Sequence, residues 1–504
     1  MTDINHELNR LLRYSLNRKL IGPEDLVCAA NHLIALFGQA EFRLEEAGEI
    51  PSTVDDILEK LLDQAVNLGL IENTQTRRDL FDTLIMDQVT PRPSEVVRRF
   101  QELYKNSPGE ATDFFFDFSV AANYVRKGRT DRNISWLAPT SYGDLQITIN
   151  VSKPEKDPRD IAAALSVPAS SYPACLLCRE NEGFFGSLNH PARQNLRLIP
   201  LRLGGEEWFL QYSPYVYYNE HSIILSRQHR PMKIDRLTFV NLLEFLDTLP
   251  HYFAGSNADL PIVGGSILSH DHYQGGRHRF PMDEAPVEKE YDCPAFPNLK
   301  LGRVKWPMST LRLRGRDKAG LISAATAILN DWREWSDESV GIWAYSGEIP
   351  HNTITPIARR EGDEYLLDLV LRNNRTSPEH PLGIFHPHSD VHHIKKENIG
   401  LIEVLGLAIL PPRLVPELEL IKSFLAEGRE DVGEESALPI HAEWYHELRT
   451  EFNGAATKEI EAGLREKVGK KFLRVLEHAG VFKRDDQGLA AFDRFVQKIS
   501  GELK

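Results

Sequence analysis

The sequence predicts an α+β protein in which helical regions flank a central region of strands, and three observations favour this class. Apolar residues recur at helical period through residues 1–115 and again beyond Pro411. Residues 144–151 instead alternate between apolar and polar side chains with the period of a strand. A succession of strand, helix and extended segment then occurs twice, so we expect a duplicated unit in the middle of the chain.

Length and charge exclude several classes of protein. The chain has 504 residues, and 59 Lys and Arg against 73 Asp and Glu give a net charge of −14, which argues against general nucleic-acid binding. With 41% apolar residues the chain can bury a large core, which excludes disorder. Its apolar stretches fall short of the ~18 residues of a membrane span. Because the start resembles no signal peptide, we expect a cytoplasmic protein without membrane contact.

Helical periodicity is clearest in four segments. They are residues 26–37, 57–70, 414–425 and 456–478. Between them, the first succession comprises an extended segment at 212–226, a helix at 235–253 and an apolar segment at 261–268. The second comprises a strand at 309–313, a helix at 320–335 and extended segments at 352–358 and 365–372. The duplication rests on element order alone, so a chance succession stays open as the alternative.

Residues 264–276, which read GGSILSHDHYQGG, hold the most informative side chains of the chain. On an extended backbone His270, His272 and Gln274 alternate and therefore point to one face. A neutral imidazole can attack phosphorus, and an amide can donate to a phosphoryl oxygen without protonating the nucleophile. Glycines on both sides allow a charged ligand to approach the backbone closely. The alternative is a strand end with two solvent-facing histidines, but the spaced Gln and the glycines favour a phosphate-transfer site.

Cys175 and Cys178 have the spacing of two thiolate ligands of one tetrahedral ion. A closed site needs two more ligands, for which His229 and His270 are the candidates. His270 lies two residues before His272, so a metal bound to His270 would hold the strand and keep His272 in position. Such a metal has a structural role. Zinc and iron both suit such ligands, and a reduced cysteine pair packed without metal is the alternative.

A second histidine cluster, at residues 386–393, ranks below the first as a nucleophile. It lacks a Gln two residues after His388 and has no glycine-rich run before it. A surface loop or a weak metal site is the better interpretation.

Several basic and amide side chains are candidate ligands for phosphate or nucleotide groups in this acidic chain. They are Arg126, Arg129, Asn195, Lys395 and Lys396. An ordinary charged turn explains the two arginines equally well, a solvated pair is the better explanation of the two lysines, and the signal at Asn195 is weak.

Together these residues resemble the galactose-1-phosphate uridylyltransferases, in particular their long bacterial class II form. Besides the SHDHYQ motif, the matching segments are residues 151–158, 189–195, 212–221 and 394–400. The resemblance implies two histidine-triad-like halves and ping-pong transfer of UMP from UDP-glucose to galactose 1-phosphate. It also implies a homodimer.

The resemblance assigns roles to individual residues. It implies that His272 is the nucleophile, assisted by Gln274, and that Cys175, Cys178, His229 and His270 hold a structural zinc. The family also has a shorter class of enzymes. Gly265 and Ser266 lie where residues of that class contact phosphate, although the serine is offset by one position. The implied regions are a helical one at 1–115, a catalytic half at 116–300, a second half at 301–412 and a helical one at 413–504.

Two other functions stay open from the residues. A dinucleoside polyphosphate phosphorylase shares the His-x-His-x-Gln arrangement but acts on adenine nucleotides and inorganic phosphate. A zinc-stabilised protein that binds nucleotide sugars without turnover would need the same pocket. The preferred hexose 1-phosphate depends on one or two hydroxyl contacts that the sequence does not specify.

Overall fold

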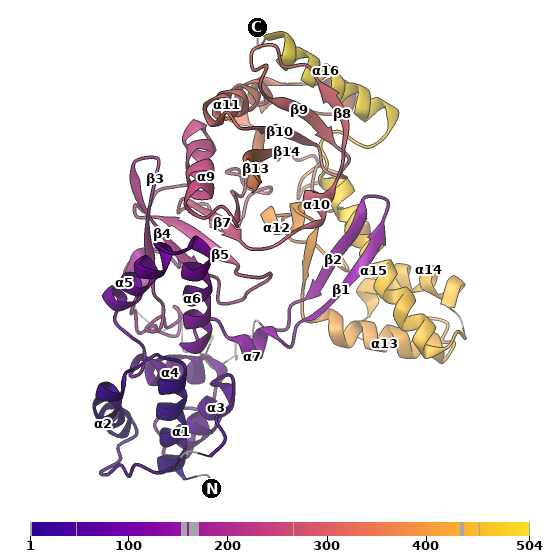
Figure 1. Cartoon of the computed structure of the whole chain (residues 1–504). Helices are drawn as coiled ribbons and strands as arrows, with labels where there is room; N and C mark the ends of the chain where they lie inside the picture. The colour runs from indigo at the N-terminus through magenta and orange to yellow at the C-terminus, as the bar shows by residue number, and fades with distance from the viewer. Residues whose placement is uncertain are drawn as a thin grey trace. The chain divides into compact units, whose positions relative to one another are not determined.

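The computed structural model describes residues 3–46, 48–152, 159–160, 171–265, 267–433, 438–452 and 454–502, and Figure 1 shows their course. By its internal contacts the chain forms two units, which we describe separately. Unit 1 comprises Met1–Arg132, Ser152–Arg230 and Ser269–Gly276; unit 2 comprises Asn133–Val151, Pro231–Leu268 and Arg277–Lys504. Each unit therefore joins segments that are distant in the sequence.

Unit 1 begins with helices that bury their apolar side chains. They are α1 (Ile4–Asn17), α2 (Leu26–Leu36), α3 (Asp55–Asn67), α4 (Gln75–Asp87), α5 (Pro93–Tyr104), α6 (Pro108–Ala121) and α7 (Lys127–Thr130). The helices predicted at 26–37 and 57–70 are confirmed as α2 and α3. Local signals fix where α6 begins, because the Ser107 hydroxyl accepts from the Gly109 N–H and Pro108 occupies the first turn, where a helix needs no N–H donor.

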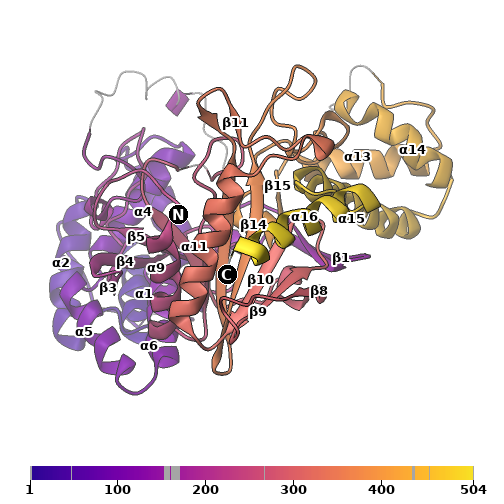
Figure 2. The same cartoon turned by 90° about the horizontal axis from the view of Figure 1, so that it is seen from above.

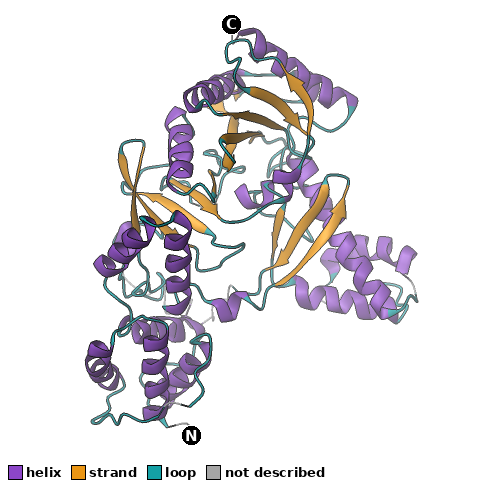
Figure 3. Ribbon diagram, viewed as in Figure 1, coloured by secondary structure: helices purple, strands orange, loops and turns teal. Residues whose placement is uncertain are grey.

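Four antiparallel strands complete unit 1 (Figure 3). In sheet order they are β3 (Ile199–Leu203), β4 (Glu206–Tyr212), β5 (Ser222–Ser226) and β7 (His272–Gly276). Helix α6 packs on β4, where the Tyr212 ring lies 5.1 Å from that of Phe115 and its hydroxyl donates to the Thr112 carbonyl. The register pairs Leu225 with His272 and Ile223 with Gln274, so β5 holds the strand that carries the predicted site.

The single extended segment predicted at 212–226 is wrong. The chain turns between β4 and β5, and Tyr212 pairs with Ser222 across the two strands. Val216 and Glu220 have φ values of 35° and 53° within the turn. Its Tyr-rich sequence favours a strand by composition, whereas positive φ values bend the backbone back.

Unit 2 contains a larger sheet and most of the remaining elements. Its strands, in sheet order, are β6 (Phe253–Gly255), β13 (Asn352–Glu361), β14 (Glu364–Asn373), β10 (Thr310–Gly315), β9 (Lys300–Val304) and β8 (Val287–Tyr291). A second sheet joins β1 (Ile134–Thr140), β2 (Gly143–Ile149) and β15 (Leu407–Leu410), and a hairpin joins β11 (Tyr345–Ser346) to β12 (Ile349–Pro350). The alternating segment predicted at 144–151 is confirmed as β2.

The helices of unit 2 pack on these sheets or follow them in the chain. They are α9 (Arg236–Thr248), α10 (Pro281–Glu284), α11 (Lys318–Glu334), α12 (Leu401–Val404), α13 (Leu414–Ala426), α14 (Ala442–Phe452), α15 (Thr457–Ala479) and α16 (Asp486–Glu502). Figure 2 shows α11 lying along β14 and β10. The predicted helices at 320–335, 414–425 and 456–478 are confirmed as α11, α13 and α15, and the helix predicted at 235–253 is confirmed as α9 except at its end, since α9 ends at Thr248 and Phe253 begins β6. No helix among the described residues is both long and apolar enough to cross a membrane.

The strand orders confirm the predicted duplication. In unit 1 the order is β7-β5-β4-β3, and in unit 2 the strands β14-β10-β9-β8 repeat it with antiparallel pairing throughout. In chain order, helix α9 follows β5 before β7, and helix α11 follows β10 before β14. The chain is therefore an α+β protein with a repeated strand-helix-strand unit. The region boundaries at 115, 300 and 412 stay a prediction.

The apolar segment predicted at 261–268 is not a strand in its described residues. Ile262 has a φ of 73°, and a Cβ on Gly264 would lie 2.7 Å from the Ala258 carbonyl oxygen. In its described residues the segment is a close turn in which Val263 is buried, and composition alone does not distinguish such a turn from a strand.

Candidate active site and metal cluster

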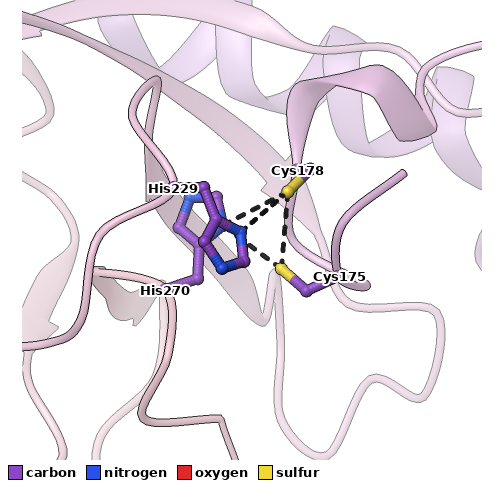
Figure 4. Close-up of side chains that lie close together, drawn as sticks. All are labelled: Cys175, Cys178, His229 and His270. Atoms are coloured by element: carbon purple, nitrogen blue, oxygen red, sulfur yellow. Dashed lines mark hydrogen bonds between the residues drawn. The ribbon is translucent and has the colours of Figure 1, made fainter. Parts of the chain in front are cut away.

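Two cysteines and two histidines of unit 1 meet in one cluster just before strand β7 (Figure 4). The Cys175 Sγ lies 3.6 Å from the Cys178 Sγ and 3.2 Å from the His270 Nδ1. The Cys178 Sγ lies 3.1 Å from the His229 Nδ1 and 3.7 Å from the His270 Nδ1. All four ligand atoms lie within 4.8 Å of one another, so the cluster brings together the four residues predicted as metal ligands.

The donor set and its spacing suit a tetrahedral ion. Zinc bonds of ~2.3 Å to sulfur and ~2.0 Å to nitrogen place the ligand atoms of a tetrahedron roughly 3.3–3.8 Å apart. The His270 Nε2 donates to the Ser226 carbonyl at 2.8 Å, which turns the Nδ1 lone pair toward the sulfurs. Burial raises the pKa of the Cys178 thiol to about 11, so a thiolate there would need a cation beside it. The cluster can therefore hold a metal.

The same backbone turn carries the predicted nucleophile. Strand β7 begins at His272, whereas His270 lies in the bend before it. The prediction that His270, His272 and Gln274 lie on one strand is therefore wrong for His270. The His272 Nδ1 lies 2.8 Å from the His270 carbonyl, which can only accept a hydrogen bond. The proton is therefore on Nδ1, and Nε2 carries the lone pair.

Burial keeps the His272 ring uncharged. The side chain is buried, and desolvation lowers the pKa of His272 to about 4, although the hydrogen bond to the His270 carbonyl opposes the shift. The neutral ring is the form in which an imidazole can act as a nucleophile. No hydrogen bond to Nε2 occurs among the described residues.

Gln274 lies two residues farther along β7, on the same face as His272, because side chains alternate along a strand. Its Oε1 lies 3.1 Å from the Nε2 of His221, the residue just before β5. The sequence argument missed His221, although a histidine directly before a strand that pairs with the motif is a usable signal. Burial lowers the pKa of His221 to about 4.

The opposite face of β7 is closed by packing and ion pairs. The Tyr273 ring stacks on Trp208 at 4.9 Å, and Arg230 lies 5.9 Å from the same tryptophan ring. Arg230 also pairs with Asp271 at 3.2 Å and with Glu206 at 2.7 Å. These contacts hold β7 through its Tyr273 face. The opposite face, which carries His272 and Gln274, is the one that could contact a substrate.

Models of a known family match most of the chain. The "Galactose-1-phosphate uridyl transferase, N-terminal domain" matches residues 21–231, and the C-terminal domain of the same family matches residues 245–437. The chain belongs to the galactose-1-phosphate uridylyltransferase family. A relative from Clostridium acetobutylicum with that name is 58% identical over 98% of this chain and 99% of its own length. One from Bacillus subtilis is 50% identical over 100% of this chain and 99% of its own.

A solved structure is also similar, at a much lower level. The crystal structure of yeast Ap4A phosphorylase Apa2 has a TM-score of 0.33 and 13% identity, covering 58% of this chain and 89% of that chain.

The basic residues predicted to bind phosphate in this transferase already have partners in unit 1. Arg126 pairs with Asp82 at 2.5 Å, and Arg129 donates to both carboxylate oxygens of Asp79. The Asn195 amide donates to the Ala122 carbonyl at 2.8 Å. Their roles at a substrate stay predictions, and each would require them to share or leave these partners.

The predicted substrate ligands in unit 2 have different surroundings. Lys395 is buried and donates to Glu403 at 3.0 Å, whereas Lys396 is exposed. A Cβ on Gly265 would lie 2.5 Å from the Asn257 Nδ2, so a side chain there would displace the Asn257 carboxamide. Ser266 lies outside the described residues.

The second histidine cluster of the transferase is occupied by contacts within unit 2. The His388 ring stacks between His380, at 4.0 Å, and His478, at 4.2 Å, and its Nε2 donates to the Ile384 carbonyl. The His386 nitrogens contact Pro387 and Asn398. These contacts favour His272 over His388 as the nucleophile.

Proposed function

We propose that this chain transfers UMP from UDP-glucose to galactose 1-phosphate through a uridylyl group on His272. One observation carries the proposal: a neutral imidazole, with its proton fixed on Nδ1, lies at a strand start on the same face as a carboxamide two residues away. This arrangement supplies a nucleophile and a hydrogen-bond donor for a phosphoryl group.

The reaction has two in-line displacements. In the first, the His272 Nε2 attacks the α-phosphorus of UDP-glucose, an N–P bond forms, and the P–O bond to glucose 1-phosphate breaks. In the second, a phosphate oxygen of galactose 1-phosphate attacks the same phosphorus, and the N–P bond breaks to give UDP-galactose. The Nδ1 proton stays hydrogen-bonded to the His270 carbonyl, which stabilises the charge that develops on the ring.

Gln274 would donate its N–H groups to a non-bridging oxygen of the transferred group. An uncharged amide supports the phosphoryl charge without offering an acidic proton to the leaving group or to water. The uridylyl-histidine would then survive until the second sugar phosphate enters.

We propose zinc as the metal at Cys175, Cys178, His229 and His270. A bound zinc ion would supply structural stability, because four protein ligands leave it no open position for substrate. The residues themselves orient the backbone of His270, whose carbonyl sets the proton position on His272.

Family resemblance supports three further proposals. The enzyme acts as a homodimer, it lies in the cytoplasm, and Lys396, which is exposed, binds a sugar phosphate. Chemical cross-linking and sedimentation of the purified chain test the first of these.

Isotope exchange tests the central proposal. With UDP-glucose and labelled glucose 1-phosphate alone, the enzyme should move label into UDP-glucose, because the first displacement is reversible. A protein that only binds nucleotide sugars gives no exchange. A covalently labelled histidine from diadenosine tetraphosphate, and none from UDP-glucose, would instead identify a dinucleoside polyphosphate phosphorylase.

A further inference from the structure

The turn that ends at His221 has a fixed shape. The Ser213 N–H donates to the His221 carbonyl at 2.7 Å, and the His221 N–H donates to the Tyr218 carbonyl at 3.1 Å. Glu220, the residue before His221, has a φ of 53°, where residues with side chains are uncommon. Backbone strain of this kind persists only where the surrounding structure holds it.

Strand β7 provides that support. The Tyr218 hydroxyl donates to the Gly275 carbonyl at 3.1 Å. Gly276, with a φ of 152°, lies so close to the turn that a Cβ there would be 2.7 Å from the Glu220 carbonyl oxygen. The turn is therefore packed directly on the two residues that follow Gln274.

This packing places the His221 ring against the Gln274 side chain. The ring is buried, with 3% of its surface exposed, and lies 4.4 Å from the Tyr218 ring and 5.5 Å from the Tyr217 ring. Its Nε2 lies 3.1 Å from the Gln274 Oε1, an atom that only accepts, so Nε2 carries the proton. The Nδ1 of His221 is buried and has no partner among the described residues.

The contact decides which end of the carboxamide is available. With Oε1 held by His221, the NH₂ group of Gln274 is the end without a protein partner among the described residues. An unrestrained carboxamide would present its oxygen and its NH₂ group in turn, and the oxygen would repel a phosphoryl oxygen. A fixed donor avoids that reorganisation during the reaction.

We propose that His221 is a positioning residue, which holds the Gln274 carboxamide so that its NH₂ group donates to the transferred uridylyl group. The proposal rests on the proposed function, because it needs Gln274 to act on a phosphoryl group. It assigns a role to a residue that belongs to neither the His-x-His-x-Gln motif nor the metal cluster.

A double-mutant cycle tests the proposal through the exchange reaction. His221→Phe keeps a ring but removes the donor, and we expect kcat to fall roughly 10- to 100-fold with less than a threefold change in KM. Gln274→Ala should lower kcat at least as much. If His221 acts through Gln274, the double variant should match Gln274→Ala, because the donor has nothing left to hold. Multiplied losses in the double variant would overturn the proposal.

Two further variants separate positioning from structure. His221→Gln retains an N–H donor and should recover part of the lost kcat, whereas His221→Met should behave as the Phe variant does. His278→Phe is the matched control, because the His278 Nε2 makes the same kind of contact, at 2.8 Å, to the Gln146 Oε1 in unit 2. It should leave exchange within about twofold of the parent. If neither His221→Phe nor His221→Met folds, His221 is structural and the proposal is wrong. Absence of exchange in the parent enzyme would instead contradict the proposed function.

Discussion

The two repeats use the same strand order for different purposes. In unit 1, β7 pairs with β5 and presents His272 and Gln274, which are uncharged. In unit 2, β14 pairs with β10, and Asp368 of β14 accepts two hydrogen bonds from Arg312, at 2.7 and 2.9 Å. Arg359 also pairs with Asp368, at 2.7 Å. The repeat in unit 1 keeps these polar groups available, and the repeat in unit 2 pairs its buried charges internally.

In a duplicated fold, chemistry requires a repeat whose polar side chains are free to contact a substrate. Asp368 is fully buried, and its pKa stays below the ordinary value because Arg312 and Arg359 outweigh the desolvation. A group held by two cations has no capacity left for a substrate. The Cys-His cluster of unit 1 lies just before β7 and includes none of the side chains on the face that carries His272 and Gln274.

The largest expected effect is the loss of the nucleophile in unit 1. His272→Asn should lower exchange between UDP-glucose and glucose 1-phosphate by roughly a thousandfold or more, because no other group supplies the lone pair. His388→Asn, in the stacked cluster of unit 2, should stay within about threefold when the rate is given per folded molecule. A larger loss of exchange from His388→Asn would show that the nucleophile lies in unit 2 and not in unit 1.

The ion pairs of Asp368 with Arg312 and Arg359 in unit 2 should contribute to stability and not to activity. Asp368→Asn leaves Arg312 and Arg359 buried with less compensation and should destabilise the fold by about 3–5 kcal/mol in denaturant unfolding. Exposed Asp363, at the turn between β13 and β14, provides the control, since Asp363→Asn should change stability by less than about 0.5 kcal/mol. If Asp368→Asn instead abolishes exchange in fully folded protein, the division of roles is wrong.

Removing a proposed metal ligand of unit 1 should lower both the metal content and the thermal stability. Cys178→Ser should lower bound zinc from about one ion per chain to near zero, and the melting temperature should fall by roughly 5–10 °C. Elemental analysis and thermal unfolding measure the two effects. Cys293→Ser changes a buried cysteine of unit 2 and should leave the zinc content unaltered. Equal metal content in both variants would exclude the cluster as the site.

The smallest expected effect concerns buried histidines that serve no proposed chemistry. Burial, with His441 and nearby cations, lowers the pKa of His393 to about 3, so the folded state binds fewer protons than the unfolded one. Stability is therefore fully present above about pH 6.5 and falls as the pH drops toward 3. His393→Phe should reduce this slope by up to about 1.4 kcal/mol per pH unit in denaturant unfolding. An unchanged slope would show that His393 is not the titrating group.

The sequence predicted the parts of the molecule that depend on local spacing. Helical periodicity located α2, α3, α13 and α15, and ligand chemistry selected His229 and His270 for the cysteine pair. The pairing of Arg126 with Asp82 was not predictable, because 44 residues separate the partners and either charge is ordinary on a surface. The contact of His221 with Gln274 spans 53 residues and depends on a turn that the sequence favours as a strand.

One contact makes the site tolerant of genetic change. The acceptor that fixes the His272 proton is the main-chain oxygen of His270, which every amino acid possesses. A point mutation can remove a side-chain aspartate that orients an imidazole, but it cannot delete a peptide carbonyl. A substitution can therefore disturb this contact only by moving the backbone at His270, the residue whose side chain lies in the cluster with Cys175.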